Sequence, residues 1–412
     1  MTLIPSPGRR RQSGVLEDTP SSPRELNRAA RRASSRRATR RMLLAALAAL
    51  AIVVAAVAAS WVVLSSQEEP APLQPAAAPS GGASAAVVIT DNQGTAASIA
   101  LLGTEDDFAS ELVLFPPALL TTVPGFGEAE LGDVTRFGGQ GLARHTLMNL
   151  LGIRVDGALV ISAEDFAQAV GIPLAVDLPN ALIISEGTSQ VVAIGEGASE
   201  RSPAELARLL SEQGTADQLA WLVRQGAVWE AVLLAAEADP MILERLGAQA
   251  GTDAEAVSRA LVGTVSDSER QVVAAAVRPV ERPGGDVELY DLPGDSVTAI
   301  ATVQFPYLRI GEAPRVRVEV LNGNGLIGTT HLVAEELIAE GFWVVRTDNA
   351  DAFDYETTKV IAQGRENQRS ALEVQRLLTL GEVEVEQRQP SGVVDLTIIV
   401  GGDLPSGSSD GP

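Results

Sequence analysis

The chain has 412 residues, of which 46 % are hydrophobic but only 4 % aromatic, so it can hold two or three domains of ~100–200 residues with aliphatic cores. It has no cysteine, which excludes disulfides, thiolate metal sites and cysteine nucleophiles. Residues 1–41 hold eleven arginines against three acidic residues, a balance of +8, so the net charge of −22 leaves −30 on the remainder. An acidic remainder repels polyanions, and we therefore expect no nucleic acid among the partners.

A segment of membrane length follows the arginine-rich stretch. Met42–Leu64 is 23 residues without a charge, enough to cross a hydrocarbon core of about 30 Å as a helix. Arginines precede it, and Glu68 and Glu69 follow it, so the positive-inside rule places residues 1–41 in the cytoplasm as a disordered tail. We expect a single-pass protein of the cell membrane, with the lipid bilayer as a partner and the C-terminal bulk extracytoplasmic. A cleaved signal peptide is the alternative, because Ala56-Val57-Ala58 resembles a cleavage site.

The next segments indicate a spacer and then a mixed domain. Residues 65–85 are rich in Pro, Ala, Gly and Ser, which predicts a disordered linker. Residues 86–310 alternate short apolar runs with helical patterns, so we expect an α/β domain with a mixed sheet. The expected strands are 86–89, 98–102, 112–115 and 158–162, and the expected helices are 140–151 and 163–170.

Several local signals refine the second half of this domain. Ser202-Pro203-Ala204-Glu205 predicts a helix start with a capping box, and Thr252–Glu255 predicts a second one. Between them Trp221 and Trp229 lie eight residues apart, on one face of a helix that Gly226 could divide. Residues 279–313 are rich in Pro and Gly and read as strand and loop.

A compact unit occupies residues 314–403, and residues 404–412 read as a disordered tail. The patterns predict a small α/β sandwich related to split βαβ folds. Its expected strands are 316–321, 342–346, 358–362, 383–387 and 394–400, and its expected helices are 330–340 and 367–378.

This unit contains a literal G-x-G-x-x-G, from Gly323 to Gly328, with Asp348 at the spacing of a ribose-binding acid. The preceding strand alternates charged residues with valines, whereas a central parallel strand of a dinucleotide-binding sheet is buried on both faces. The unit is also too short for the second half of such a sheet. We therefore interpret the motif as a tight turn that needs glycine backbone freedom.

Metal binding has little support in the sequence. His145 and His331 are the only histidines, both are expected on helices, and they lack the spacing of metal ligands. We interpret each as a surface or core-edge residue and expect no metal site and no cofactor.

The C-terminal unit resembles the C-terminal domain of LytR-type proteins. The resemblance lies in the run from Val316 to Gly328, in Gly341-Phe342, in Tyr355 with Thr358, and in Gly401-Gly402-Asp403. The match covers about 90 residues.

Residues 86–280 resemble a degenerate LytR–CpsA–Psr domain, through the short motifs Val123-Pro124-Gly125, Gly138-Gly139, Leu150–Ile153 and Arg224-Gln225. The resemblance implies a phosphotransferase ancestry, in which arginines and aspartates hold a polyprenyl pyrophosphate and Mg²⁺. Most of those charged residues are replaced here, by Ala96-Ala97-Ser98-Ile99, Pro116-Pro117-Ala118 and Leu210-Ser211-Glu212.

These observations favour a non-catalytic envelope protein, a binding or scaffolding module that contacts cell-wall polymer or other envelope proteins. An active LytR–CpsA–Psr-type phosphotransferase with Mg²⁺ is the alternative. A membrane-bound transcriptional regulator is the weakest reading, because the 41-residue tail is too short for a DNA-binding fold. Candidate contacts with a ligand or partner are Arg224, Gln225, Asn322, Gly323, Asn324 and Gly325.

Overall fold

The structure, a computed structural model, describes residues 82–281, 288–311, 314–386 and 393–404. All of them belong to one compact unit, Pro75–Pro412. The predicted tail, membrane segment, most of the linker and the residues after Leu404 lie outside the described residues. The end of the predicted linker needs a correction, because strand β1 already begins at Ala83, where small apolar residues are buried.

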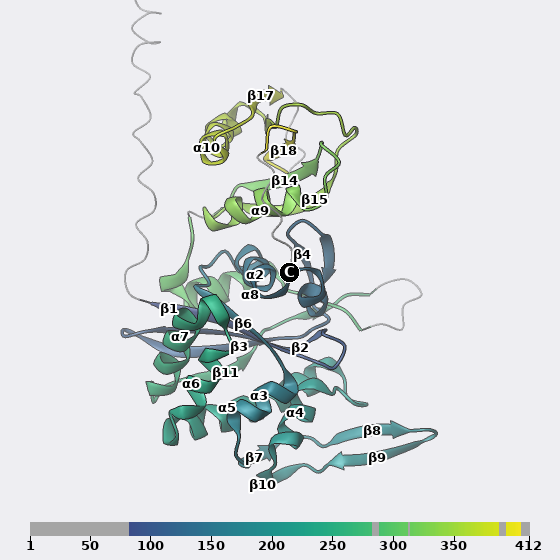
Figure 1. The fold of residues 1–412 in the computed structure, drawn as a ribbon, viewed down its shortest axis with the longest axis vertical. Helices are drawn as coiled ribbons and strands as arrows, with labels where there is room; N and C mark the ends of the chain where they lie inside the picture. Colours follow the sequence, from purple (N-terminus) through teal and green to yellow (C-terminus); the bar gives the residue numbers. More distant parts are fainter. Residues whose placement is uncertain (1–81, 282–287, 312–313, 387–392, 405–412) are drawn as a thin grey trace, which may run out of the picture. The chain divides into compact units, whose positions relative to one another are not determined.

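A five-stranded mixed sheet forms the centre of the first domain (Figure 1). Its order is β11-β3-β2-β1-β6; β1 and β2 pair antiparallel, as do β2 and β3, whereas the two outer strands pair parallel. Every residue of β1 is buried, so both faces of the sheet are covered. The four strands expected from the sequence are present, as β1 Ala83–Thr90, β2 Ala96–Glu105, β3 Phe108–Phe115 and β6 Gly157–Ser162. The fifth, β11 Gln271–Ala274, was not predicted.

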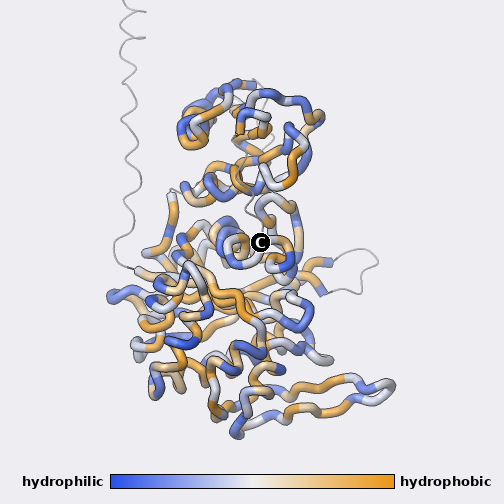
Figure 2. Tube along the Cα trace, viewed as in Figure 1, coloured by the Kyte–Doolittle hydropathy of each residue, from blue (hydrophilic) through white to orange (hydrophobic). Residues whose placement is uncertain are grey.

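Two apolar cores lie on the two faces of this sheet. Alternate residues of β1 divide between them: Val88 belongs to the same core as Leu147 of helix α2, and Val87 to the same core as Trp229 of helix α5. Figure 2 shows the apolar residues concentrated along these central strands. The helices are α2 Val134–Leu151, α3 Ala163–Val170, α4 Pro203–Ser211, α5 Gln218–Ala238, α6 Met241–Ala248 and α7 Ala254–Ser266.

Some helix signals were interpreted correctly and others were wrong. Ser202 and Glu205 form the expected capping box of α4. The second expected box is absent, because Thr252 lies inside a 3-10 turn, Gly251–Asp253, and α7 begins without a side-chain cap. Gly226 does not divide α5, which runs on unbroken around it. The two tryptophans of α5 are both buried, as predicted.

Among the described residues, α5 alone is long and apolar enough to cross a membrane, and 56 % of its apolar window is buried inside the protein. It serves as a core helix, since its buried residues pack against the sheet and against neighbouring helices. The predicted membrane segment, residues 42–64, is not among the described residues.

The sequence did not predict the helical turns and the small hairpins of this domain. Residues 294–308 form α8 Gly294–Ala299, a π-helix at Ile300–Gln304 and a short 3-10 turn, because Ile300, Phe305 and Leu308 are drawn into the core. The two-stranded pairs are β4 Leu120–Val123 with β5 Gly127–Glu130, β7 Leu174–Leu178 with β10 Gly197–Arg201, β8 Leu182–Glu186 with β9 Ser189–Ile194, and β12 Arg278–Pro279 with β13 Tyr290–Asp291.

The C-terminal domain is a second five-stranded sheet, with the order β15-β14-β18-β16-β17. The pairs are parallel except for β16 with β18. Helices α9 and α10 cover one face, which buries alternate residues such as Val318 and Val320. Every predicted element is present within three residues of its expected ends: β14 Arg317–Asn322, α9 Thr329–Ala339, β15 Trp343–Asn349, β16 Lys359–Gln363, α10 Gln368–Leu378, β17 Glu382–Glu386 and β18 Leu396–Val400.

Candidate functional site

Arg224 lies on α5 and is fully buried. Its Nη1 donates to Asn180 Oδ1 at 3.0 Å and to the Ala181 carbonyl at 3.2 Å, and its Nη2 donates to the carbonyls of Glu212 and Gln213 at 2.9 and 3.0 Å. Burial lowers the pKa of this guanidinium to about 10, against the opposing charge of Glu212. The side chain thus holds the segment that leaves α4 through its two terminal nitrogens, whereas its buried Nε has no hydrogen-bond partner among the described residues.

Gln225 is also buried, beside Arg224 on the same helix. Its Nε2 donates to the carbonyls of Ala97 at 2.9 Å and Leu210 at 3.1 Å. Ala97 belongs to the segment that replaces the charged strand implied by the family resemblance, and Leu210 begins another such segment. The amide therefore joins α5 to two segments whose buried side chains carry no charge.

Two surface clefts stand out among those that the described residues form. The first, of about 270 Å³, lies between α5, α6 and α7 and includes Glu237 and Glu244 among mainly apolar residues. The second, of about 390 Å³, lies at the β2–β3 hairpin and is lined by five acidic residues, Glu105, Asp106, Asp107, Asp267 and Glu269. Neither contains an arginine or a lysine, so neither offers a positive charge to a phosphate.

The Asn322–Gly325 segment forms a closed turn at the end of β14. Asn322 Oδ1 accepts from the amides of Asn324 and Gly325 at 3.2 and 2.9 Å, and Asn324 Nδ2 donates to the Gly401 carbonyl at 2.9 Å. Gly325 has φ +73°, which favours glycine. A Cβ on Gly323 would lie 2.6 Å from Ile399 Cγ2, so glycine is needed there for close packing. This geometry is that of the tight turn predicted from the sequence.

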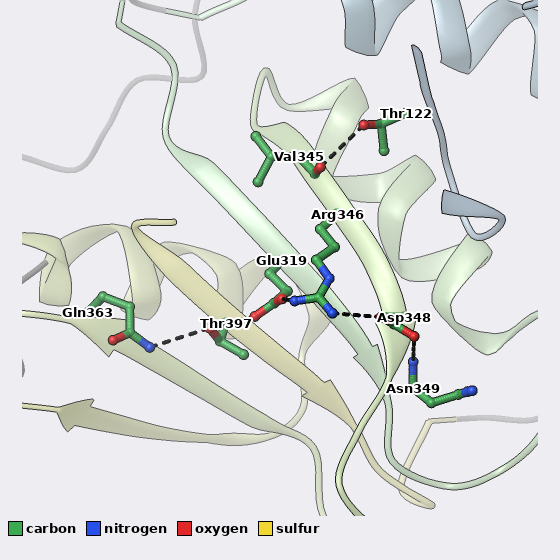
Figure 3. A network of polar contacts seen from close by, with 8 residues as sticks. All are labelled: Thr122, Glu319, Val345, Arg346, Asp348, Asn349, Gln363 and Thr397. Carbon is green, nitrogen blue, oxygen red and sulfur yellow. Dashed lines mark hydrogen bonds and ion pairs between the residues drawn. The ribbon is translucent and has the colours of Figure 1, made fainter. Parts of the chain in front are cut away.

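Asp348, the acid at the spacing of a ribose ligand, takes part in a network on the exposed face of the C-terminal sheet (Figure 3). Arg346 connects Glu319 at 2.9 Å with Asp348 at 2.7 Å, and Thr397 Oγ1 lies 3.4 Å from Glu319 Oε2. The Arg346 hydrogen bond lowers the pKa of Asp348. The charged residues of β14 and β15 on this face therefore compensate one another.

The two domains meet at a seam that the sequence did not predict. The amide of Asn149, from α2, imitates a neighbouring strand: it accepts from Val344 N at 2.9 Å and donates to Val344 O at 2.8 Å on edge strand β15. Thr122 Oγ1 donates to the Val345 carbonyl at 3.2 Å (Figure 3). Arg315 donates to the Asn149 carbonyl at 2.9 Å and stacks over the Trp343 ring. These contacts occupy the free edge of the C-terminal sheet.

Both histidines also lie at this seam. His145 Nδ1 of α2 is 2.6 Å from Glu335 Oε1 of α9, and His331 Nε2 of α9 is 3.3 Å from the same oxygen. Sequence reasoning treated the histidines as unrelated, because no local spacing joins residues of different domains. Within the described residues no group of three or more His, Cys, Asp or Glu side chains has the arrangement of a metal site.

Comparisons with solved structures find similar folds at low sequence identity. TagV from Bacillus subtilis is 11 % identical, with 55 % of this chain and 97 % of that chain covered and a TM-score of 0.44. TagT bound to LIIa-WTA is 16 % identical, with 59 % and 95 % covered and a TM-score of 0.41. A LytR-Csp2A-Psr enzyme from Actinomyces oris is 18 % identical, with 57 % and 92 % covered and a TM-score of 0.42.

No curated protein sequence matches this chain. A protein-family model does match its C-terminal domain, over residues 315–404, close to the 314–403 expected from the sequence motifs. That confirms the resemblance of this domain. The chain thus carries, over residues 315–404, a domain of the LytR_C family, described as LytR cell envelope-related transcriptional attenuator.

Proposed function

We propose that this protein is a non-catalytic cell-envelope module, anchored by residues 42–64, whose extracytoplasmic part binds cell-wall polymer or other envelope proteins. The LytR_C domain supports an envelope role. The residues upstream supply a second folded domain, which we interpret as a LytR–CpsA–Psr-like domain that has lost its phosphotransferase function.

The observation that carries the proposal is the position of Arg224. It is the arginine that the family resemblance would assign to a pyrophosphate. A pyrophosphate needs several cationic donors that are free to contact it, because the charge on the transferring phosphate must be neutralised. Arg224 instead donates to four protein oxygens in the core. The chemistry of this side chain therefore favours a structural role.

The surface charge supports the same proposal. The acidic cleft at the β2–β3 hairpin disfavours an anionic ligand. The charge of −30 outside residues 1–41 disfavours polyanions in general, including nucleic acid. An uncharged glycan, a peptide or another protein is a better match to this surface than a phosphate-rich chain.

Co-sedimentation with purified peptidoglycan sacculi tests the binding half of the proposal. The full-length chain in detergent should pellet with sacculi stripped of anionic polymers at least as well as with unstripped sacculi. Removal of residues 315–404 should weaken that binding if the LytR_C domain contributes. Absence of binding to both kinds of sacculi, together with no captured envelope protein, would contradict the proposal.

The alternative is an active transferase of the LytR–CpsA–Psr type that uses charged residues at other positions and Mg²⁺. A transferase must turn over a polyprenyl pyrophosphate-linked polymer, whereas a binding module need not. A transfer assay therefore separates the two functions.

A further inference from the structure

The only two histidines of the chain face one carboxylate oxygen across the seam between the domains. Their side chains are largely shielded, with 12 % of His145 and 26 % of His331 exposed, and 24 % of Glu335 is exposed. His145 comes from α2, whereas Glu335 and His331 lie one turn apart on α9. A change in the charge of any of these groups therefore directly alters the interaction between the two domains.

A neutral His331 ring has fewer N–H groups than there are acceptors around it. Its Nε2 faces Glu335 Oε1, and its Nδ1 lies 3.3 Å from the carbonyl of Pro124 on the upstream domain. Both partners are acceptors, and a neutral imidazole carries a single N–H. Only the protonated ring can donate to both at once. Neutral His331 must leave one acceptor facing a nitrogen lone pair.

The charges around the cluster favour an ionised Glu335. Burial raises its pKa, but the 2.6 Å contact with His145 Nδ1, with the charges of His145, His331 and Arg144, outweighs burial and leaves the pKa below its usual value. Arg144 itself lies 3.7 Å from Asp253, which offsets part of its charge. Glu335 thus stays a charged acceptor at pH values where histidines gain their second proton.

We propose that His145, His331 and Glu335 form a proton-dependent latch that tightens the contact between the two domains as the surroundings become acidic. Protonation turns His331 into a donor to both domains and turns the 2.6 Å contact between His145 Nδ1 and Glu335 Oε1 into an ion pair, and charge-assisted contacts are stronger than neutral ones. The latch weakens once the surroundings are acidic enough to protonate Glu335, whose pKa lies below its usual value.

Hydrogen exchange of the Val344 amide tests the latch, because this amide donates to Asn149 across the seam and exchanges when the seam opens. We expect its protection factor in the full-length chain to rise about fivefold from about pH 7.5 to about pH 5.5, the gain of a charged over a neutral hydrogen bond. The Gly323 amide, bonded to Val400 inside the C-terminal domain at 3.0 Å, should not change.

Glu335→Gln keeps the size of the side chain and removes its charge, so it should abolish the rise. Glu336→Gln, the same substitution on the exposed neighbouring residue, should retain it. His331→Gln, which cannot gain a proton, should reduce it, and serves if Glu335→Gln fails to fold. A Val344 protection factor that does not rise in the wild type, or a rise that survives in Glu335→Gln, would overturn the proposal.

Discussion

Replacing Arg224 by methionine should strongly destabilise the upstream domain. Methionine fills much of the same volume but leaves four partly buried acceptors, on Asn180, Ala181, Glu212 and Gln213, without their donors. Leaving a buried acceptor without its donor costs about 1–3 kcal/mol, so the loss of four hydrogen bonds from a charged donor to partly buried acceptors should total about 3–5 kcal/mol. For a domain of this size that corresponds to a fall in melting temperature of roughly 10 °C. We expect this loss of stability because we assign a structural role to Arg224.

Tryptophan fluorescence during urea unfolding of the full-length chain in detergent provides the assay, because Trp221 and Trp229 lie on the same helix as Arg224. Arg136→Met is the matched control, since the Arg136 side chain is 60 % exposed and pairs only with Asp133 at 3.2 Å; it should change stability by less than about 0.5 kcal/mol. Arg224→Lys should be intermediate, because lysine lacks the planar fork. Unfolding of Arg224→Met within about 1 kcal/mol of wild type would refute the reasoning.

Three further predictions follow from the sequence and the structure. Gly323→Ala should destabilise the C-terminal domain by about 1–3 kcal/mol through overpacking, whereas Gly141→Ala, whose Cβ would meet nothing within 4 Å, should be neutral or stabilising in thermal unfolding. The hydrogen bond from Arg317 lowers the pKa of Asp395, so its contribution to stability is present above the usual carboxyl range and lost as pH falls below about 3.9; the stability difference between wild type and Asp395→Asn should shrink there. Mass spectrometry of the mature protein should find residues 9–41 retained, and an N-terminus near residue 59 would refute the anchor.

The C-terminal domain could be predicted closely because its signals are local. Alternation of charged and apolar residues defined β14, and the structure explains it: one face of that strand meets the helices and the other carries the Glu319 network. The turn at Asn322–Gly325 was predicted from glycine spacing alone. The upstream strands were found for a different reason, namely uninterrupted apolar runs that the sheet buries on both faces.

The remaining features depend on contacts between distant segments. The helical turns at residues 294–308 are stabilised by burial of Ile300 and Phe305, which a Pro- and Gly-rich composition conceals. Asn149 and Val344 are 195 residues apart, and His145 is equally remote from Glu335, so no periodicity could associate them. The burial of Arg224 could not be predicted either. The sequence pattern predicted its helix but not the four oxygens that its guanidinium contacts.

The most direct test of the central claim is an assay of catalysis. The full-length chain in detergent would be incubated with a polyprenyl pyrophosphate-linked glycopolymer, peptidoglycan and Mg²⁺, and the release of the polyprenyl carrier measured beside Arg224→Ala. We expect no turnover above background from either protein, because loss of even one stabilising donor commonly lowers such rates by ~10²–10³-fold. Clear wild-type turnover would contradict the account and identify the chain as an active transferase, whether or not Arg224→Ala, which should also lose stability, retains it.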